Sequence, residues 1–292
     1  MVFSGFIITY NRSNLILDSI SKVLSQSVSP DFLWIIDNSS DSLTLEAVDS
    51  LKSKKVKYHH MGSNAGPAGA AAKGLELCAA DKADWIYWGD DDDPPTDPLI
   101  FEELFSIINF LPNNVKVGQV GLVGQLFDTQ KGKIKRIENE VLNREFVLVD
   151  NIAGNQIKII NSNVVASNLL PNPKLFFGFE ELDFDLKMKN RGFLSFISGE
   201  LMFKQRVKYN TLNKTSNFNK HYQNNENWRD FYSNRNLLYI LWINQMYLGF
   251  FNRLTVLLVK PIFNLRYGLK SFFSQVKFAL RVFVGFLKLL NA

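Results

Sequence analysis

Short apolar runs alternate with amphipathic segments over the first hundred residues, and this alternation limits the possible fold more than any other feature. Four runs have the length and the β-branched or aromatic content of strands, and three intervening segments have helical periodicity. The runs lie at residues 2–8, 32–37, 56–60 and 84–88, and the helical segments at 14–26, 42–52 and 68–80. Strands that are apolar throughout and separated by helices form parallel sheets covered on both faces. The sequence therefore predicts an α/β fold with a Rossmann-like, mostly parallel sheet.

Polar or glycine-rich loops follow all four predicted strands. They read "TYNR" at 9–12, "DNSSD" at 37–41, "GSNAGPAG" at 62–69 and "GDDDDPP" at 89–95. Sheets of this kind bind ligands at the carboxyl ends of their strands, so these loops should meet at one edge. We therefore expect the functional site there.

The fourth loop carries four consecutive aspartates, Asp90, Asp91, Asp92 and Asp93. Neighbouring carboxylates repel by roughly 3 kcal/mol per pair at an effective dielectric constant of about 20. One interpretation is a solvated acidic turn, and the other is a site for a divalent cation that offsets the repulsion. Residues two apart point to the same side of an extended chain, so Asp90 with Asp92, or Asp91 with Asp93, could share an ion. The position at a sheet edge favours the cation, Mg²⁺ or Mn²⁺.

Two other loops suit a nucleotide-linked substrate. Asp37 could accept a hydrogen bond from a nucleobase imide or, alternatively, cap the turn that follows it. Asn64, Gly66 and Gly69 lie where a helix is expected to begin, so backbone N–H groups there can approach diphosphate or sugar oxygens. The loop matches neither of the two glycine-rich phosphate-binding motifs.

A second acidic cluster lies in "FFGFEELDFDLKMKNRGF" at 176–193. Glu180, Glu181, Asp183 and Asp185 follow an aromatic, glycine-containing approach. One interpretation is an amphipathic surface helix with a negative first turn, which the helix dipole favours. The other is a general base, for which aromatic surroundings and neighbouring carboxylates are favourable.

The net charge of +5 is unevenly distributed. Residues 237–292 contain seven Lys or Arg and no Asp or Glu, which leaves about −2 on the first 236 residues. We divide the chain into a catalytic domain at 1–205 and a helical C-terminal region at 206–292. The acidic main domain argues against a nucleic-acid groove. A single cysteine, Cys78, fits a reducing cytosol, and the N-terminal segment lacks the basic region of a signal peptide, so we expect a cytoplasmic protein.

The C-terminal region is both apolar and basic. The run "LLYILWINQMYLGFF" at 237–251 is shorter than the about 20 residues that a membrane-spanning helix needs. The later segment "LKSFFSQVKFALRVFVGFLKLL" at 269–290 mixes Lys and Arg with large apolar residues at helical spacing. This pattern is typical of an interfacial helix attracted to anionic lipid. The alternative is packing against the catalytic domain or against a sister subunit, which would make a homo-oligomer.

Taken in order, these motifs resemble family 2 glycosyltransferases with the GT-A fold. They are "TYNR", "DNSSD", "NAGPAG", the aspartate run after an apolar strand, and the acidic pair followed by Lys187 and Gly192. The resemblance is greatest to the rhamnosyl- and galactofuranosyltransferases of bacterial surface-polysaccharide assembly, and it extends from residue 3 to about 196. The segment "WRDFYSNRNLLY" at 228–239 resembles the tyrosine and Arg-Asn signature of that branch.

The resemblance implies roles in binding the donor and a metal ion. The residues that would bind the nucleotide sugar are Thr9, Arg12, Asp37, Asn64, Gly66, Gly69, Asp90 and Asp91. Asp90 and Asp92 would hold Mn²⁺ or Mg²⁺. The family often has a metal-binding histidine further along, but the matching segment "GELMFKQRV" has none. His221 could substitute for it, although an exposed loop histidine without a metal is the favoured interpretation of that residue.

The resemblance also implies a base and an acceptor site. Glu181 matches the position of the family's catalytic aspartate, with Glu180 and Asp183 as alternatives. The residues that would contact the acceptor are Trp88, Tyr232, Arg235 and Asn236.

The function implied is a single displacement that inverts the anomeric configuration. The expected donor is a nucleoside diphosphate sugar, with UDP as the nucleotide and galactofuranose, rhamnose or a similar hexose as the sugar. The expected acceptor is a lipid-linked glycan at the inner face of the plasma membrane. One alternative is a nucleotidyltransferase, which should have a glycine-rich, basic loop where this chain has "TYNR". The other is an inactive glycan-binding or scaffold protein.

Overall fold

The computed structural model describes residues 1–112, 114–153, 157–212 and 228–292. The chain forms two compact units. The first comprises Met1–Gln125, Ile137–Phe176 and Glu181–Asn213, and the second comprises Leu126–Arg136, Phe177–Glu180 and Lys214–Ala292. His221 lies outside the described residues.

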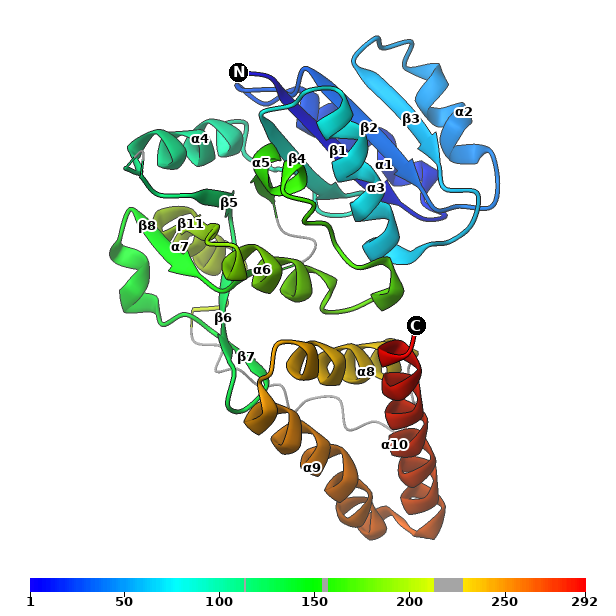
Figure 1. Cartoon of the computed structure of the whole chain (residues 1–292). Helices are drawn as coiled ribbons and strands as arrows, with labels where there is room; N and C mark the ends of the chain where they lie inside the picture. Colours follow the sequence, from blue (N-terminus) through cyan, green and yellow to red (C-terminus); the bar gives the residue numbers. More distant parts are fainter. Residues whose placement is uncertain (113, 154–156, 213–227) are drawn as a thin grey trace. The chain divides into compact units, whose positions relative to one another are not determined.

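The first hundred residues form the predicted alternation of strands and helices (Figure 1). The strands are β1 (Phe3–Thr9), β2 (Phe32–Asp37), β3 (Val56–His60) and β4 (Trp85–Asp90). The helices between them are α1 (Ser13–Leu24), α2 (Leu43–Ser50) and α3 (Gly66–Ala80). The four strands pair in parallel in the order β3-β2-β1-β4, which confirms the predicted α/β fold.

Further strands extend this sheet in mixed directions. β10 runs antiparallel to both β4 and β5, β11 is parallel to β5, and β8 is antiparallel to β11. The described sheet therefore has eight strands in the order β3-β2-β1-β4-β10-β5-β11-β8. The elements in this part of the chain are α4 (Ile100–Phe110), β5 (Val117–Gly121), η1 (Asn139–Asn143), β8 (Phe146–Val149), β9 (Asn151–Ile152), β10 (Lys158–Asn161), α5 (Ser162–Ala166), η2 (Pro173–Leu175), α6 (Glu180–Asn190), β11 (Leu194–Ser198) and α7 (Gly199–Lys208).

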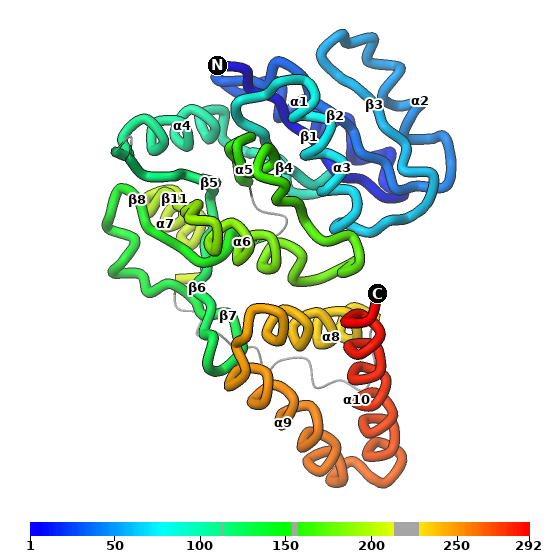
Figure 2. The backbone as a smooth tube through the Cα atoms, in the orientation of Figure 1, coloured from blue at the N-terminus to red at the C-terminus, as the bar shows by residue number. Residues whose placement is uncertain are grey.

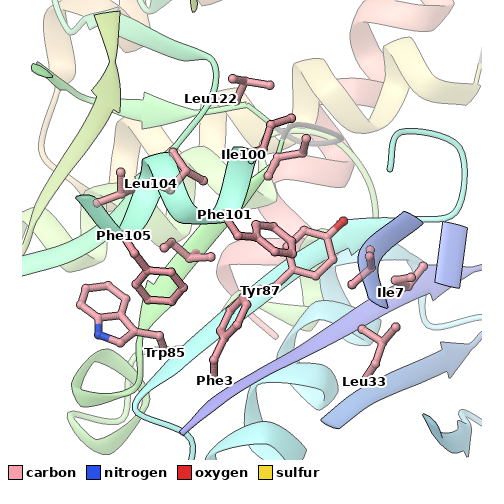
Figure 3. Close-up of a cluster of buried hydrophobic side chains, with 14 of the residues drawn as sticks. Phe3, Ile7, Leu33, Trp85, Tyr87, Ile100, Phe101, Leu104, Phe105 and Leu122 are labelled. Carbon is pink, nitrogen blue, oxygen red and sulfur yellow. The ribbon is translucent and has the colours of Figure 1, made fainter. Parts of the chain in front are cut away.

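Helices cover both faces of the sheet because successive strand residues point to opposite sides. One face packs against α1, α2 and α4. There, the Phe3 ring lies edge-on to Phe101 and Phe105 of α4, with centroids 5.3 and 5.0 Å apart (Figure 3). The other face packs against α3, α5 and α6. Each large side chain buried in this way contributes about 1.5–3 kcal/mol, so the sheet is a stable platform whose strand ends remain for ligands.

The second unit contains a strand hairpin and a group of helices. Strands β6 (Gly124–Asp128) and β7 (Lys133–Lys135) pair antiparallel, and the first two residues of β6, which belong to the first unit, pair with β9 in that unit. The helices described are α8 (Trp228–Ile243), α9 (Tyr247–Asn264), the short η3 (Leu265–Tyr267) and α10 (Leu269–Leu290). α8, α9 and α10 follow one another as three sides of a triangle, each in contact with the other two (Figure 2).

The apolar run at 237–251 is divided between two helices. α8 ends at Ile243 and α9 begins at Tyr247, and Gln245 between them has a φ of 58°. A different stretch, Tyr247–Tyr267, is the one in the described part of the chain that is long and apolar enough to cross a membrane, judged by length and composition alone. Of the 18 residues that form the most apolar part of this stretch, 28 % are buried in the structure.

The hydroxyl group of Tyr87 provides a test of this core. Tyr87 is fully buried, and none of the described residues offers its hydroxyl a hydrogen-bond partner. We therefore expect Tyr87→Phe to change the free energy of unfolding by less than about 1 kcal/mol, as measured by urea denaturation. Tyr58→Phe is the matched control, because the Tyr58 hydroxyl donates to Asp37 Oδ2 at 2.8 Å, and this variant should lose about 1–3 kcal/mol. A larger loss for Tyr87→Phe than for Tyr58→Phe would contradict the packing described here.

Candidate active site

The carboxyl ends of β1, β2 and β4 lie side by side. Thr9 is the register partner of Asp37, and Ile8 is the partner of Asp90. Thr9, Asp37 and Asp90 therefore lie at one edge of the sheet, on three neighbouring strands. The predicted meeting of the loops is confirmed in this part of the structure.

Asp91 connects the loop after β4 to the loop after β1. Its Oδ2 accepts a hydrogen bond from Thr9 Oγ1 (2.7 Å), and its Oδ1 accepts one from an Arg12 Nη (2.9 Å). Ser19 Oγ donates to the Asp91 carbonyl oxygen (2.6 Å), and Arg12 forms a second ion pair with Asp92. Both carboxylate oxygens of the buried Asp91 have partners. The pair of Asp91 and Asp93 is therefore a weaker candidate for a cation site than the pair of Asp90 and Asp92.

Asp90 is half-buried at the end of β4 and lies among other carboxylates. Burial, together with the charges of Glu181 and Asp92, raises the pKa of Asp90 to about 7. Burial and the charge of Asp92 also raise the pKa of Asp93 to about 6. This edge of the sheet therefore concentrates negative charge, so a positive ion would be strongly attracted to it.

The residues at this edge fit a divalent cation only in part. Among the residues that the structure describes, no group of three or more His, Cys, Asp or Glu side chains is arranged to hold an ion. Mg²⁺ is usually bound by one or two carboxylates together with substrate phosphates and water. Asp90 and Asp92 match that arrangement, since a cation between them and a diphosphate would offset the repulsion that raises the pKa of Asp90.

Asp37 already has partners inside the protein. Its Oδ1 accepts a hydrogen bond from Ser39 N (2.8 Å), which is the turn-capping role considered for it. Its Oδ2 accepts from Tyr58 Oη (2.8 Å), and burial together with this carboxylate raises the pKa of Tyr58. A nucleobase would have to share these oxygens, and the base-binding role of Asp37 stays a prediction.

The glycines of the 62–69 loop have roles in packing. Asn64 Oδ1 accepts a hydrogen bond from Gly66 N (2.9 Å), and Gly66 has a φ of +69°. A Cβ at Gly66 would lie 2.2 Å from the carbonyl oxygen of Phe176, so a larger residue would push the two segments apart. A Cβ at Gly69 would lie 2.7 Å from the Cβ of Ala65. Contact of Asn64, Gly66 and Gly69 with a diphosphate stays a prediction.

The acidic helix α6 is buried, so the surface-helix interpretation is wrong. Its apolar residues Leu182, Phe184, Leu186 and Met188 are buried in the core. Asp185 is buried too, and its Oδ2 accepts hydrogen bonds from Asn151 Nδ2 (2.8 Å) and Ile152 N (2.9 Å). The helix is held in place by polar as well as apolar contacts. Sequence periodicity missed this because acidic residues are rarely buried without partners distant in sequence.

The three candidates for the base have different surroundings. Asp183 is fully buried and forms an ion pair with Lys187 one turn later, at 2.5 Å between Oδ2 and Nζ. Glu180 is 4 % exposed. Glu181 is partly exposed, and its charge is close enough to raise the pKa of Asp90. Glu181 is therefore the candidate with both access to solvent and proximity to the aspartate loop.

Lys158 is a residue of this site that the sequence reasoning missed. It is 1 % exposed, and its Nζ lies 3.8 Å from the centroid of the Trp88 ring on the neighbouring strand. Its charge lowers the pKa of both Asp90 and Asp185, against the effect of burial. The sequence feature that could have revealed Lys158 is its position inside the apolar run 157–160. A lysine in such a run is expected to be buried, and a buried lysine needs a carboxylate or an aromatic partner.

The predicted acceptor residues are divided between the two units, with Trp88 in the first and the other three in the second. Trp88 is buried, with its ring centroid 6.1 Å from that of Phe184 in the core. The Arg235 guanidinium lies 4.7 Å from the Tyr232 ring centroid and donates to Asn236 Oδ1. Their contact with an acceptor stays a prediction.

Asn236 supports the turn that leads into α6. Its Nδ2 donates to the carbonyl oxygens of Phe177 (3.0 Å) and Gly178 (2.8 Å), all within the second unit. Gly178 has a φ of +83°, so the turn depends on glycine. This contact gives the Arg-Asn signature a structural role just before the first acidic residue of α6.

Residues 4–157 match the profile of the family described as "Glycosyl transferase family 2", which is more than half of the chain. The chain belongs to this family. A stretch of 107 residues of this family 2 chain is 35 % identical to the galactofuranosyltransferase GlfT1 of Mycolicibacterium smegmatis (strain ATCC 700084 / mc(2)155). The match covers 36 % of this chain and 34 % of GlfT1, so it spans about a third of that curated relative.

Solved structures share the fold of this chain. The mannosyltransferase PcManGT of Pyrobaculum calidifontis, solved with GDP-Man and Mn²⁺, has a TM-score of 0.53 at 12 % identity, over 98 % of this family 2 chain and 86 % of that chain. TarS 1–349 of S. aureus, solved with UDP, has a TM-score of 0.50 at 14 % identity, over 68 % of this chain and 58 % of that chain. The predicted GT-A fold is confirmed by these similarities.

The buried Asp185 predicts a pH-dependent stability. Burial raises the pKa of Asp185 to about 6, so the folded state favours the protonated carboxyl group. Its contribution to stability is complete below about pH 4 and is lost as the pH rises through 6. We expect the free energy of unfolding of the wild type, minus that of Asp185→Asn, to fall by about 2–3 kcal/mol between about pH 4 and pH 7. Urea denaturation of both proteins at each pH measures this, and a constant difference would contradict it.

Proposed function

We propose that the chain is an inverting glycosyltransferase that transfers a sugar from a UDP-sugar to a hydroxyl group of a lipid-linked glycan. The sugar is galactofuranose, rhamnose or a similar hexose. The observation that supports this most is that Asp90 lies at the carboxyl edge of the parallel sheet, within electrostatic range of both Asp92 and Glu181. The similarity to a galactofuranosyltransferase supports the sugar, and the UDP and GDP-Man in structures of the same fold support the nucleotide donor.

In this proposal the loops after the parallel strands bind the donor. Asp37 accepts a hydrogen bond from the base, and the 62–69 loop approaches the diphosphate with its backbone N–H groups. Arg12, already held by Asp91 and Asp92, keeps the aspartate loop in position. When bound by Asp90 and Asp92, Mn²⁺ or Mg²⁺ supplies positive charge for the diphosphate leaving group.

Glu181 acts as the general base. Its carboxylate takes the proton from the acceptor hydroxyl group, and the acceptor oxygen attacks the anomeric carbon of the donor sugar. The bond between that carbon and the diphosphate oxygen breaks, and the nucleoside diphosphate leaves with the electron pair. Attack from the side opposite the leaving group inverts the anomeric configuration, and no covalent enzyme intermediate is required.

The proposed acceptor determines where in the cell the enzyme acts. A glycan attached to a lipid, as in bacterial surface-polysaccharide assembly, would keep the enzyme at the inner face of the plasma membrane.

The test of the whole proposal is calorimetric binding of UDP with and without Mn²⁺, followed by UDP release from a panel of UDP-sugars with a lipid-linked acceptor. We expect binding to tighten with Mn²⁺ and one sugar to dominate. Absence of binding of any nucleoside diphosphate would contradict the proposal.

Removal of either metal-binding carboxylate should abolish the metal effect. In Asp90→Asn and Asp92→Asn, turnover should fall by about 10²-fold or more, because the leaving group loses its charge stabilisation. The melting temperature should stay within a few degrees. Asp18→Asn is the control, since Asp18 is an exposed helix residue paired with Lys22 (2.6 Å) and should behave as wild type. Near-normal turnover of both variants in the presence of EDTA would show that no metal acts at this pair.

The assignment of the base is tested by three variants measured side by side. Glu181→Gln keeps the size of the side chain but cannot accept a proton, so turnover should fall by about 10²-fold or more with unchanged donor affinity. Glu180→Gln and Asp183→Asn should retain more activity than Glu181→Gln. Glu200→Gln is the control, because Glu200 is exposed and forms an ion pair with the neighbouring Lys204 (2.8 Å).

The conservative variant adds a second readout. Glu181→Asp should recover part of the lost turnover, because it restores a carboxylate of the type that the family uses. A collapse of turnover confined to Glu180→Gln or Asp183→Asn would move the base to that residue.

A further inference from the structure

Helices α9 and α10 meet at one end of each helix (Figure 1), and exposed apolar side chains that the proposed reaction does not use lie there. We call residues 256–273 the α9–α10 corner; they comprise the end of α9, η3 and the start of α10. Eight large apolar side chains there are between 44 and 68 % exposed. They are Val256, Leu258, Ile262, Phe263, Leu265, Tyr267, Leu269 and Phe273. Large apolar side chains exposed in this number on neighbouring elements are typical of a binding surface.

The second half of α10 has its packing partners within the unit. Its buried residues begin at Phe278, whereas no residue of the fully described stretch 265–277 is buried. The Phe286 ring centroid lies 5.4 Å from that of Phe250 on α9 and 6.4 Å from that of Trp242 on α8. The two alternatives considered for this helix therefore apply to different halves, since its buried residues all lie in the second half, where Leu280, Val284 and Leu287 form the exposed side.

The first half of α9 is held by the hairpin of β6 and β7. Asn252 Nδ2 donates to the carbonyl oxygen of Gln130 (2.6 Å). A Cβ at Gly249 would lie 2.2 Å from the carbonyl oxygen of Thr129, so the helix and the turn are in close backbone contact. A helix that crosses a bilayer would exchange these polar contacts for hydrocarbon. Although α9 is long and apolar enough to span a membrane, these contacts tie its first half to the hairpin.

The α9–α10 corner is basic as well as apolar. Lys260, Arg266 and Lys270 lie among its apolar residues, and the corner contains no Asp or Glu. Apolar side chains with cations and no anions are complementary to an anionic bilayer, whose acyl chains take the former and whose phosphates attract the latter. A second copy of the chain would instead bring two surfaces of the same charge together, which is unfavourable.

We infer that the α9–α10 corner inserts into the surface of an anionic lipid bilayer. This goes beyond the proposed function, because it assigns a lipid-binding surface whose action requires neither the donor nor the glycan. It also differs from the sequence prediction, in which residues 269–290 formed an interfacial helix or a packing helix, or both on different faces. The proposed lipid-linked acceptor would give this surface its purpose.

Vesicle co-sedimentation of the full chain tests the inference without any substrate. The chain should bind vesicles of phosphatidylcholine and phosphatidylglycerol in equal parts, bind pure phosphatidylcholine less well, and dissociate as salt is raised. The triple variant Phe263→Ser, Leu269→Ser, Phe273→Ser should partition about 10²-fold less or weaker still, because three large apolar side chains no longer insert. These side chains are exposed, so the melting temperature should not change.

A control variant tests whether the loss of vesicle binding is specific to the α9–α10 corner. The triple variant Leu248→Ser, Phe251→Ser, Leu280→Ser removes side chains that are 56 to 60 % exposed on the same two helices but outside the corner. It should partition as the wild type does. An equal loss in both triple variants would overturn the assignment of the corner.

Site-specific labelling measures the depth of insertion. Cys78, the single cysteine of the sequence, is buried, so an introduced cysteine can be labelled selectively. A polarity-sensitive dye at Leu269→Cys should shift to the blue on anionic vesicles and be quenched by a nitroxide near the headgroups, and the dye at Leu280→Cys should not. Strong quenching at Leu248→Cys by a nitroxide at the bilayer centre would show that α9 spans the membrane and would overturn the inference.

Analytical sedimentation of the lipid-free chain tests whether a second copy of the chain covers this surface instead of lipid. A dimer that is lost in the Phe263, Leu269 and Phe273 variant, without any vesicle binding by the wild type, would overturn the inference in favour of self-association. Failure of the proposed function gives a different result. A chain that binds vesicles but releases UDP from no sugar donor would support the inference and contradict the proposed function alone.

Discussion

The accumulation of negative charge at one edge of the sheet is the constraint on which the site depends. A parallel sheet brings Thr9, Asp37 and Asp90 to the same edge, and the turn after β4 adds three further carboxylates. Arg12 pairs with two of these carboxylates from the first loop, and Lys158 acts on Asp90 from a neighbouring strand. The site is therefore formed as much by these two cations as by the acidic residues, because without them the repulsion would push the loops apart.

The order of the first seven elements and their parallel pairing were predictable from sequence, because each strand is a continuous apolar run and each helix is amphipathic. The loops could also be placed, since the ends of parallel strands share one edge. The partners within these loops could not. Nothing local to Asp91 indicates that Thr9 and Arg12 occupy its oxygens, because these contacts join residues about 80 positions apart.

Helix α6 is a second case in which contacts between distant residues could not be predicted from the sequence. Its four acidic residues and weak apolar pattern suggest a surface helix, yet Asp185 is buried where Asn151 and Ile152 supply its hydrogen bonds. Lys158 lies in an apolar run for a related reason, since Trp88 and the nearby carboxylates stabilise its charge. Buried charges require partners from other elements, and such partners appear only when the chain is folded.

The close approach of Gly66 and Phe176 has a consequence for the exchange of segments between related enzymes. The backbone of the 62–69 loop rests on the carbonyl oxygen of Phe176, which also accepts a hydrogen bond from Ala68 N (3.3 Å). Four residues after Phe176, the acidic helix begins. A chimera that imports the 176–193 segment from a relative therefore also imports the shape of this contact. It should fold only if residue 66 is a glycine and the 62–69 loop fits the imported segment, so the two segments must be exchanged together although 110 positions separate them.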